Sequence, residues 1–154
     1  MTLITPSMLE FDHIGILTAN VEKACHEFGA IVGATGISQR FDDSGLGVTV
    51  QFICDGAGIV YEMIAPLGEA SPVAKVLASK SNLLNQIAYR TRSIAESAAV
   101  LRKAGSFPLG AAKPAVAFGG ALVQFFMCPQ GFIIELIEAP AHKHVFGGLG
   151  HFTL

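Results

Sequence analysis

The segment FDHIGILTANVEKA (residues 11–24) aligns with LNQIAYRTRSIAES (residues 84–97) when His13 is placed over Gln86. The same offset of 73 residues, kept without gaps, brings Val50-Gln51-Phe52 over Val123-Gln124-Phe125. It also brings Glu62 over Glu135. A single register that aligns both ends of both halves indicates an internal duplication, and such a repeat decides the fold.

Each half contains the same order of predicted elements. A short strand (residues 11–17 and 84–90) precedes a helix, for which Asn20 and the capping box of Ser93 with Glu96 supply the start. Three strands follow in each half, at residues 36–41, 47–54 and 58–64 and at residues 112–117, 121–128 and 131–138. The last two strands of each half are expected to form a hairpin, turning at residues 55–58 and 129–131.

The predicted fold class is α+β, with two tandem βαβββ modules. One such module cannot cover both faces of its sheet, so the two are expected to form a curled eight-stranded mixed sheet around a metal-containing cleft. The modules span about residues 8–68 and 82–140 of a single domain, 1–140, and a helix at 71–79 that starts at Ser71-Pro72 joins them. A tail at 141–154 follows, and its Phe146 and Phe152 are expected to dock over the cleft or across a dimer interface.

Composition excludes several classes of protein. Apolar residues make up 51% of the chain and charged residues 14%, which favours a large buried core over disorder. The net charge of −2 and the lack of a basic run argue against nucleic acid or an anionic membrane as a partner. The long uncharged stretch at 114–134 is interrupted by glycines and a proline, so it indicates strands rather than a membrane span. Three cysteines without ligand spacing, and a start that lacks the features of a signal peptide, favour the cytoplasm.

Four polar side chains occupy equivalent positions in the repeat. His13 and Gln86 lie on the first strand of each module, and Glu62 and Glu135 lie within apolar last strands. A carboxylate in such a strand is costly to bury unless it is paired or binds a metal. An imidazole, an amide and two carboxylates favour one divalent cation from the set Mn, Co, Ni, Fe, Mg or Zn. The sequence therefore predicts a metal site formed by His13, Glu62, Gln86 and Glu135.

The duplicated βαβββ order, the FDHIGI strand and the paired glutamate strands resemble the vicinal oxygen chelate superfamily. That superfamily includes glyoxalase I, methylmalonyl-CoA epimerase, extradiol dioxygenases and fosfomycin-resistance proteins. The segment YEMIAPLGEASPVAKVL, followed by NQIAYR, is most similar to the epimerase and glyoxalase branch. The resemblance implies that the metal ligands are His13, Glu62, Gln86 and Glu135. It covers the chain to about Pro140.

Two positions depart from the pattern of that branch. The ligand at the place of Gln86 is usually histidine, so the substitution is expected to weaken or tune metal binding. Epimerases of this type carry a catalytic glutamate on the third strand, where this chain has Gln51. An amide cannot act as a general base, which leaves a mechanism in which one metal-bound glutamate moves the proton.

The predicted function is metal-assisted proton transfer at the carbon α to a carbonyl, in an acyl thioester or small oxo-acid, as in methylmalonyl-CoA epimerase. Glu135 is the first choice for the catalytic proton shuttle and Glu62 the second. The substrate is predicted to contact Gln51, Arg90 and Gln124, although a salt bridge is an equal alternative for Arg90. Glyoxalase I activity is the runner-up, and a metal-free binding or resistance protein is the alternative from another class. A homodimer is left open.

Overall fold

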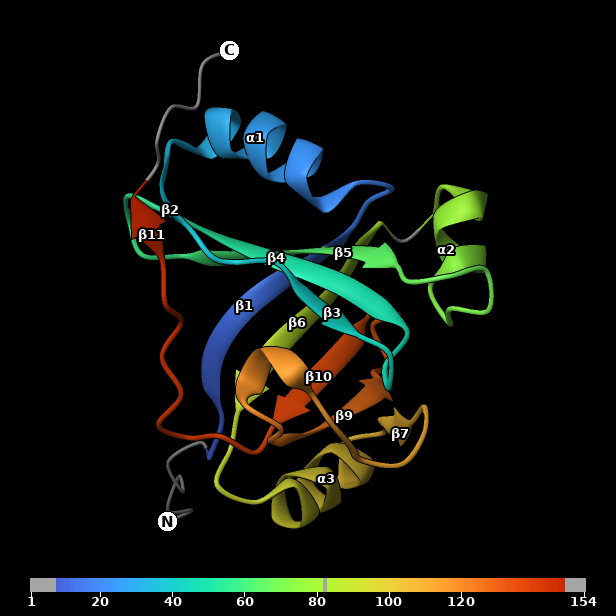
Figure 1. The fold of residues 1–154 in the computed structure, drawn as a ribbon. Helices are drawn as coiled ribbons and strands as arrows, with labels where there is room; N and C mark the ends of the chain where they lie inside the picture. The colour runs from blue at the N-terminus through green and yellow to red at the C-terminus, as the bar shows by residue number, and fades with distance from the viewer. Residues whose placement is uncertain (1–7, 82, 149–154) are drawn as a thin grey trace.

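The computed structural model describes residues 8–81 and 83–148 (Figure 1). The first module contains β1, α1 and β2 to β5, a short helix α2 follows, and the second module contains β6, α3 and β7 to β10. A last strand, β11, follows the second module. The bounds are β1 Glu10–Leu17, α1 Val21–Val32, β2 Ala34–Ile37, β3 Phe41–Asp43, β4 Val48–Asp55, β5 Val60–Pro66, α2 Ala74–Ser79, β6 Leu84–Arg90, α3 Ile94–Lys103, β7 Phe107–Pro108, β8 Lys113–Pro114, the 3₁₀ turn η1 Val116–Phe118, β9 Leu122–Met127, β10 Ile133–Ile137 and β11 Gly147–Gly148.

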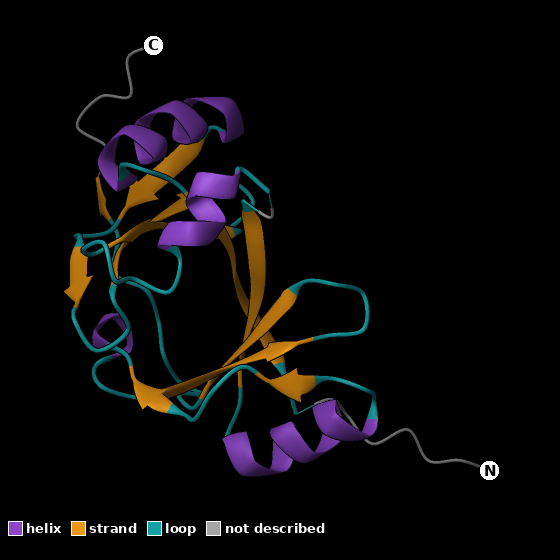
Figure 2. Ribbon diagram, turned by 90° about the vertical axis from the view of Figure 1, so that its right-hand side faces the viewer, coloured by secondary structure: helices purple, strands orange, loops and turns teal. Residues whose placement is uncertain are grey.

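The strands form one mixed sheet that continues through both modules in the order β11-β2-β4-β5-β1-β6-β10-β9-β7, with β3 on β4 and β8 on β9. The sheet curls between two helices that lie outside it at opposite ends, α1 over the first module and α3 over the second (Figure 2). Each helix has its own small core, formed by α1 with β4 and β5 and by α3 with β9 and β10. The largest core cluster lies between the two modules and includes Phe52 and Phe118.

The strand register carries the repeat through the centre of the molecule. Gly15 of β1 pairs with Glu62 of β5, and the equivalent Ala88 of β6 pairs with Glu135 of β10. β1 and β6 pair with each other in antiparallel fashion, and Ile14 opposite Ile87 marks the pseudo-twofold axis. The α+β architecture with a curled mixed sheet is therefore as predicted.

The sheet has eleven strands within the described residues, whereas eight were predicted. The predicted strand at 36–41 divides into β2 and β3 because Ser38 interrupts the ladder. Its Oγ accepts the Phe52 N–H at 2.9 Å, in place of a main-chain carbonyl. The predicted strand at 112–117 shortens to β8, because the chain turns through η1 and leaves it at Gly119 with φ +64°. Short β7 and β11 were not predicted.

Both predicted N-caps are confirmed. The side chain of Asn20 accepts the Lys23 N–H, and that of Ser93 accepts the Glu96 N–H. The linking helix starts later than predicted, at Ala74, because the Ser71 hydroxyl donates to the carbonyl of Gly47 instead of capping a helix. Among the described residues, no helix has both the length and the hydropathy that a membrane span requires.

Candidate metal centre

The four predicted ligands meet at the centre of the curled sheet. His13 Nε2 lies 3.6 Å from Glu62 Oε1 and 3.3 Å from Glu135 Oε1. The amide nitrogen of Gln86 donates to the same two oxygens, at 3.3 and 3.1 Å. All four side chains are buried, and that of His13 is 0% exposed. Rotating the Gln86 amide by 180° would place its oxygen at this point instead, since the two amide atoms occupy equivalent volumes.

A β-bulge on each central strand aims these side chains. The pairing of β1 with β6 shifts between Phe11 and His13, so Asp12 is an extra residue there. The pairing shifts again between Gly15 and Ile16, which leaves Asn85 extra on β6, next to Gln86. A bulge lets two consecutive side chains face the same side of a sheet. Both Asp12 and His13 are accordingly buried, as are Asn85 and Gln86.

Small residues opposite the ligands leave room for them. Gly15 lies across from Gln86, and a Cβ added at Gly15 would lie 2.4 Å from Gln86 Cγ, which is closer than side-chain atoms approach. The equivalent Ala88 lies across from His13 and is fully buried. The Gln86 side chain therefore lies over a backbone that only glycine provides.

The two buried carboxylates beside His13 favour the binding of a cation. Burial lowers the pKa of His13, but the charge of Glu62 and the hydrogen bond to Asp12 outweigh burial and hold that pKa well above its usual value. Burial also raises the pKa of Glu135, although the positive charge of the nearby His13 acts in the opposite direction. His13 Nε2 is buried and lacks a hydrogen-bond partner among the described residues. An orphaned imidazole nitrogen facing two carboxylates is the arrangement that a divalent cation would complete.

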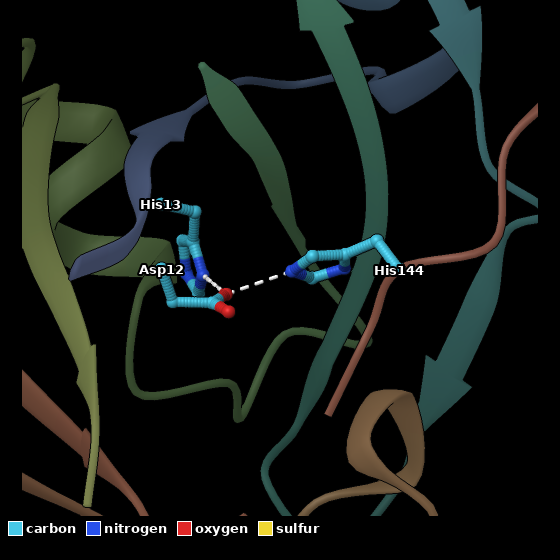
Figure 3. Close-up of side chains that lie close together, drawn as sticks. All are labelled: Asp12, His13 and His144. Carbon is cyan, nitrogen blue, oxygen red and sulfur yellow. Dashed lines mark hydrogen bonds and ion pairs between the residues drawn. The ribbon is translucent and has the colours of Figure 1, made fainter. Parts of the chain in front are cut away.

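A second set of polar groups surrounds the other nitrogen of His13. Asp12 Oδ2 accepts a hydrogen bond from His13 Nδ1 at 2.7 Å and another from His144 Nε2 at 2.7 Å. The rings of His13 and His144 approach this carboxylate from different sides (Figure 3). Hydrogen bonds to these two histidines hold the pKa of Asp12 far below its usual range, although burial opposes them. Sequence reasoning missed Asp12, because regular strand alternation turns it away from His13. The repeat supplies one signal: Asp12 aligns with the polar Asn85.

Gln51, Arg90 and Gln124, the residues predicted to contact substrate, do not join the cluster of His13, Glu62, Gln86 and Glu135. Arg90 contacts Asp12 Oδ1 at 3.2 Å and Glu10 Oε2 at 3.4 Å, and it donates to the Pro140 carbonyl. Gln51 pairs with Met63, on the face of β4 away from Glu62, and donates to the Ser38 carbonyl. Gln124 likewise pairs with Leu136 and donates to the Gly110 carbonyl. Among the described residues, the cavity that Glu62 and Glu135 line does not include these three side chains.

That cavity lies on the Gln86 side of the cluster and encloses about 470 Å³. Glu62, Gln86 and Glu135 line it. Most of its other lining is apolar, including Val48, Val50, Ile64, Val123, Phe125, Met127 and Ile133. Asp43, Asn85 and Lys113 add polar groups, and Lys113 is an exposed cation on the short edge strand β8.

Comparisons with known proteins show the family and the fold. A family model described as the glyoxalase/bleomycin resistance protein/dioxygenase superfamily matches residues 12–125. No curated protein matches the chain significantly.

Among solved structures, methylmalonyl-CoA epimerase from Mycobacterium tuberculosis is 23% identical with a TM-score of 0.71, over 88% of this chain and 91% of that one. A hypothetical protein from Bacillus halodurans is 23% identical with a TM-score of 0.74, over 89% and 99%. A variant of Streptomyces coelicolor methylmalonyl-CoA epimerase in complex with 2-nitronate-propionyl-CoA is 24% identical with a TM-score of 0.67, over 85% and 97%. At such identities these likenesses establish the fold.

Proposed function

We propose that this chain is a metal-dependent enzyme that moves a proton at the carbon α to a carbonyl. The premise is that it belongs to the glyoxalase/bleomycin resistance protein/dioxygenase superfamily. The observation that carries the proposal is the convergence of His13, Glu62, Gln86 and Glu135 at one end of a largely apolar cavity. Several buried polar groups pointing into a cavity are typical of a reaction centre.

These four residues would hold one divalent cation. When bound, such a cation supplies Lewis-acid polarisation of a substrate carbonyl, which favours loss of the neighbouring proton. His13 would contribute Nε2, because its Nδ1 donates to Asp12. Gln86 would contribute its amide oxygen, and the two glutamates would balance the charge of the cation.

Glu135 is the proposed proton shuttle. Its contacts with His13 and Gln86 both use Oε1, and its carboxylate lines the cavity where substrate would lie. A buried carboxylate whose pKa is raised by desolvation is a stronger base than one in water. Glu62 occupies the equivalent position in the first module and is the second candidate for this step.

The lining of the cavity supports a substrate with an apolar acyl or oxo part. Its walls near the glutamates are valine, isoleucine and phenylalanine side chains, which favour an alkyl or aryl group over a second carboxylate. Lys113 is placed to meet an anionic group at the cavity, such as the phosphate of a thioester carrier. Two of the solved relatives are methylmalonyl-CoA epimerases, which is consistent with an acyl thioester.

The proposed compartment is the cytoplasm. Cys25, Cys54 and Cys128 are all free thiols, as a reducing environment would keep them. Burial raises the pKa of Cys25 to about 12, so this thiol is unreactive.

The test has two parts. Elemental analysis of the purified protein, before and after a chelator, is expected to find close to one divalent ion per chain. The metal-loaded protein is then incubated in deuterated water with thioesters of increasing acyl size, and α-deuterium is measured by mass spectrometry, with Glu135→Gln as control. We expect exchange in the wild type alone. Metal without exchange on any thioester, together with turnover of a glutathione hemithioacetal, would replace the epimerase-like proposal with glyoxalase activity.

A metal-free binding protein is the second candidate, and the apolar cavity is the observation that favours it. An apolar cavity of this size suits a small hydrophobic ligand whether or not a metal is present. Protein that binds such a ligand equally well with and without chelator, and takes up no divalent ion, would establish this alternative.

A further inference from the structure

The segment from Pro140 to Gly148, here called the strap, joins the two modules after the last strand of the second. It leaves β10, runs past β1 along the left edge of the molecule in Figure 1 and ends as β11 on β2 of the first module. Arg90 fixes its beginning through the Pro140 carbonyl, at 3.0 Å, and the pairing of Gly147 with Ile37 fixes its end.

The strap is extended and turns alternate side chains inward. His142, His144 and Phe146 are half-buried, whereas Ala141, Lys143 and Val145 are exposed, Val145 to 84%. A period of two is the pattern of an extended chain that covers a surface with one face. The strap therefore presents three rings to the interior.

These rings pack against the Asp12 side of the core. His142 lies with its ring centroid 4.7 Å from that of Phe118, and His144 lies 4.6 Å from Phe52. Phe146 packs on Gly36, where an added Cβ would come within 2.7 Å of Phe146 Cβ. The large cavity is lined by Asn85 and Gln86, at the other end of the pseudo-twofold axis.

His144 is also hydrogen-bonded to the carboxylate that holds His13. Asp12 Oδ2 accepts from both histidines at 2.7 Å, and Arg90 Nε lies 3.2 Å from Oδ1 (Figure 3). Arg90 and His144 therefore hold the carboxylate, which in turn accepts the hydrogen bond from His13 Nδ1. This bond holds the ring with Nε2 facing Glu62 and Glu135.

We propose that His144 is a positioning residue, supplied by the strap, that acts through Asp12 to orient His13 for metal binding. The inference rests on the metal site proposed above. Partners in the outer shell of a metal site typically change metal affinity by about 10–100-fold when removed. His144 is one hydrogen bond further out than Asp12, so we expect its removal to lie near the lower end of that range.

The experiment compares His144→Ala and His144→Gln with Val145→Ala, an exposed control on the same strap. Affinity for Zn²⁺ is measured by competition with a chromophoric chelator. We expect about a 10-fold loss for His144→Ala, recovery to within about 3-fold for His144→Gln, whose amide can still donate to Asp12, and no change for Val145→Ala. Equal affinities of wild type and His144→Ala would overturn the proposal. So would a loss in His144→Gln as large as in His144→Ala, because packing would then be the cause.

A second readout separates this proposal from the metal site itself. In metal-free, ¹⁵N-labelled protein, NMR can follow the Nδ1–H of His13 that donates to Asp12, and the rate at which this proton exchanges with solvent reports how firmly the bond is held. We expect the Nδ1 proton to exchange slowly with solvent in wild type and His144→Gln, and faster in His144→Ala. An unchanged His13 spectrum in His144→Ala contradicts positioning even if wild type binds no metal.

Discussion

The two ends of the β1–β6 strand pair have equivalent backbones, each with a bulge, but the groups that surround the inward side chains differ. Asp12-His13 and Asn85-Gln86 are related by the repeat, and each pair is turned inward by a bulge. The Asp12 end is closed: Arg90 and His144 hold its carboxylate. At the other end, Asn85 and Gln86 line the large cavity. Duplication thus provided two equivalent positions, of which His13 is held by Asp12 and Gln86 faces the cavity.

The largest expected difference between the halves concerns the two glutamates. Glu135→Gln is expected to lower turnover of a confirmed substrate by about 10²–10⁴-fold, the usual contribution of a positioned general base. Glu62→Gln is expected to reduce metal affinity more than turnover at saturating metal. Steady-state assays at several metal concentrations check both, with thermal unfolding as control for the fold. Full activity of Glu135→Gln would exclude it from the mechanism.

Metal affinity should distinguish His13, which Asp12 holds, from Gln86, which faces the cavity. We expect His13→Ala to weaken Zn²⁺ binding by more than about 100-fold and Gln86→Ala by about 10-fold, because Asp12, itself held by His144 and Arg90, orients the ring of His13. Chelator competition measures both. Gln86→His, which restores the ligand type usual in the family, is expected to bind at least as tightly as wild type. A greater loss in Gln86→Ala than in His13→Ala would reverse the assignment.

Asp12→Asn gives position 12 the residue type of its repeat equivalent, Asn85. It removes charged hydrogen bonds to His13 and His144, and each such bond contributes about 1.5–3 kcal/mol. Because the folded-state pKa of Asp12 is lowered, its contribution is present above the unfolded pKa of about 3.9 and is lost as pH falls through the folded value. Urea unfolding of the metal-free proteins at pH 7 and at pH 3 should therefore show a smaller difference between wild type and Asp12→Asn at pH 3. A difference that does not change with pH would contradict the ion pairs.

The smallest expected effects concern the residues beneath the ligands. Gly15→Ala is expected to destabilise the protein by about 1–3 kcal/mol, because the new Cβ overlaps Gln86. The matched change at the equivalent position, Ala88→Gly, removes a methyl group and should cost about 0.5–1 kcal/mol. Urea unfolding measures both. Gly15→Ala should also weaken metal binding, and unchanged affinity would show that Gln86 is not a ligand.

Local patterns were sufficient for much of the fold and for the four central side chains. The offset that places His13 over Gln86 and Glu62 over Glu135 is a property of the sequence, and the pairing of Gly15 with Glu62 and of Ala88 with Glu135 confirms it. The caps at Asn20 and Ser93 are equally local, since each needs only a hydroxyl or amide three residues before a free N–H.

Only the tertiary structure decided which way the side chains of Asp12, Gln51 and Gln124 face. It also decided the path of the strap. Alternation along a strand assumes a regular pleat, and the bulge that turns Asp12 toward His13 exists only in the pairing of β1 with β6. The positions of α1 and α3 decide which face of β4 or β9 lines the cavity. The repeat therefore aligned Gln51 with Gln124 without showing which face either side chain occupies. His144 meets Asp12 across more than a hundred residues, and a contact of that range is set by the packing of whole elements, which no local pattern encodes.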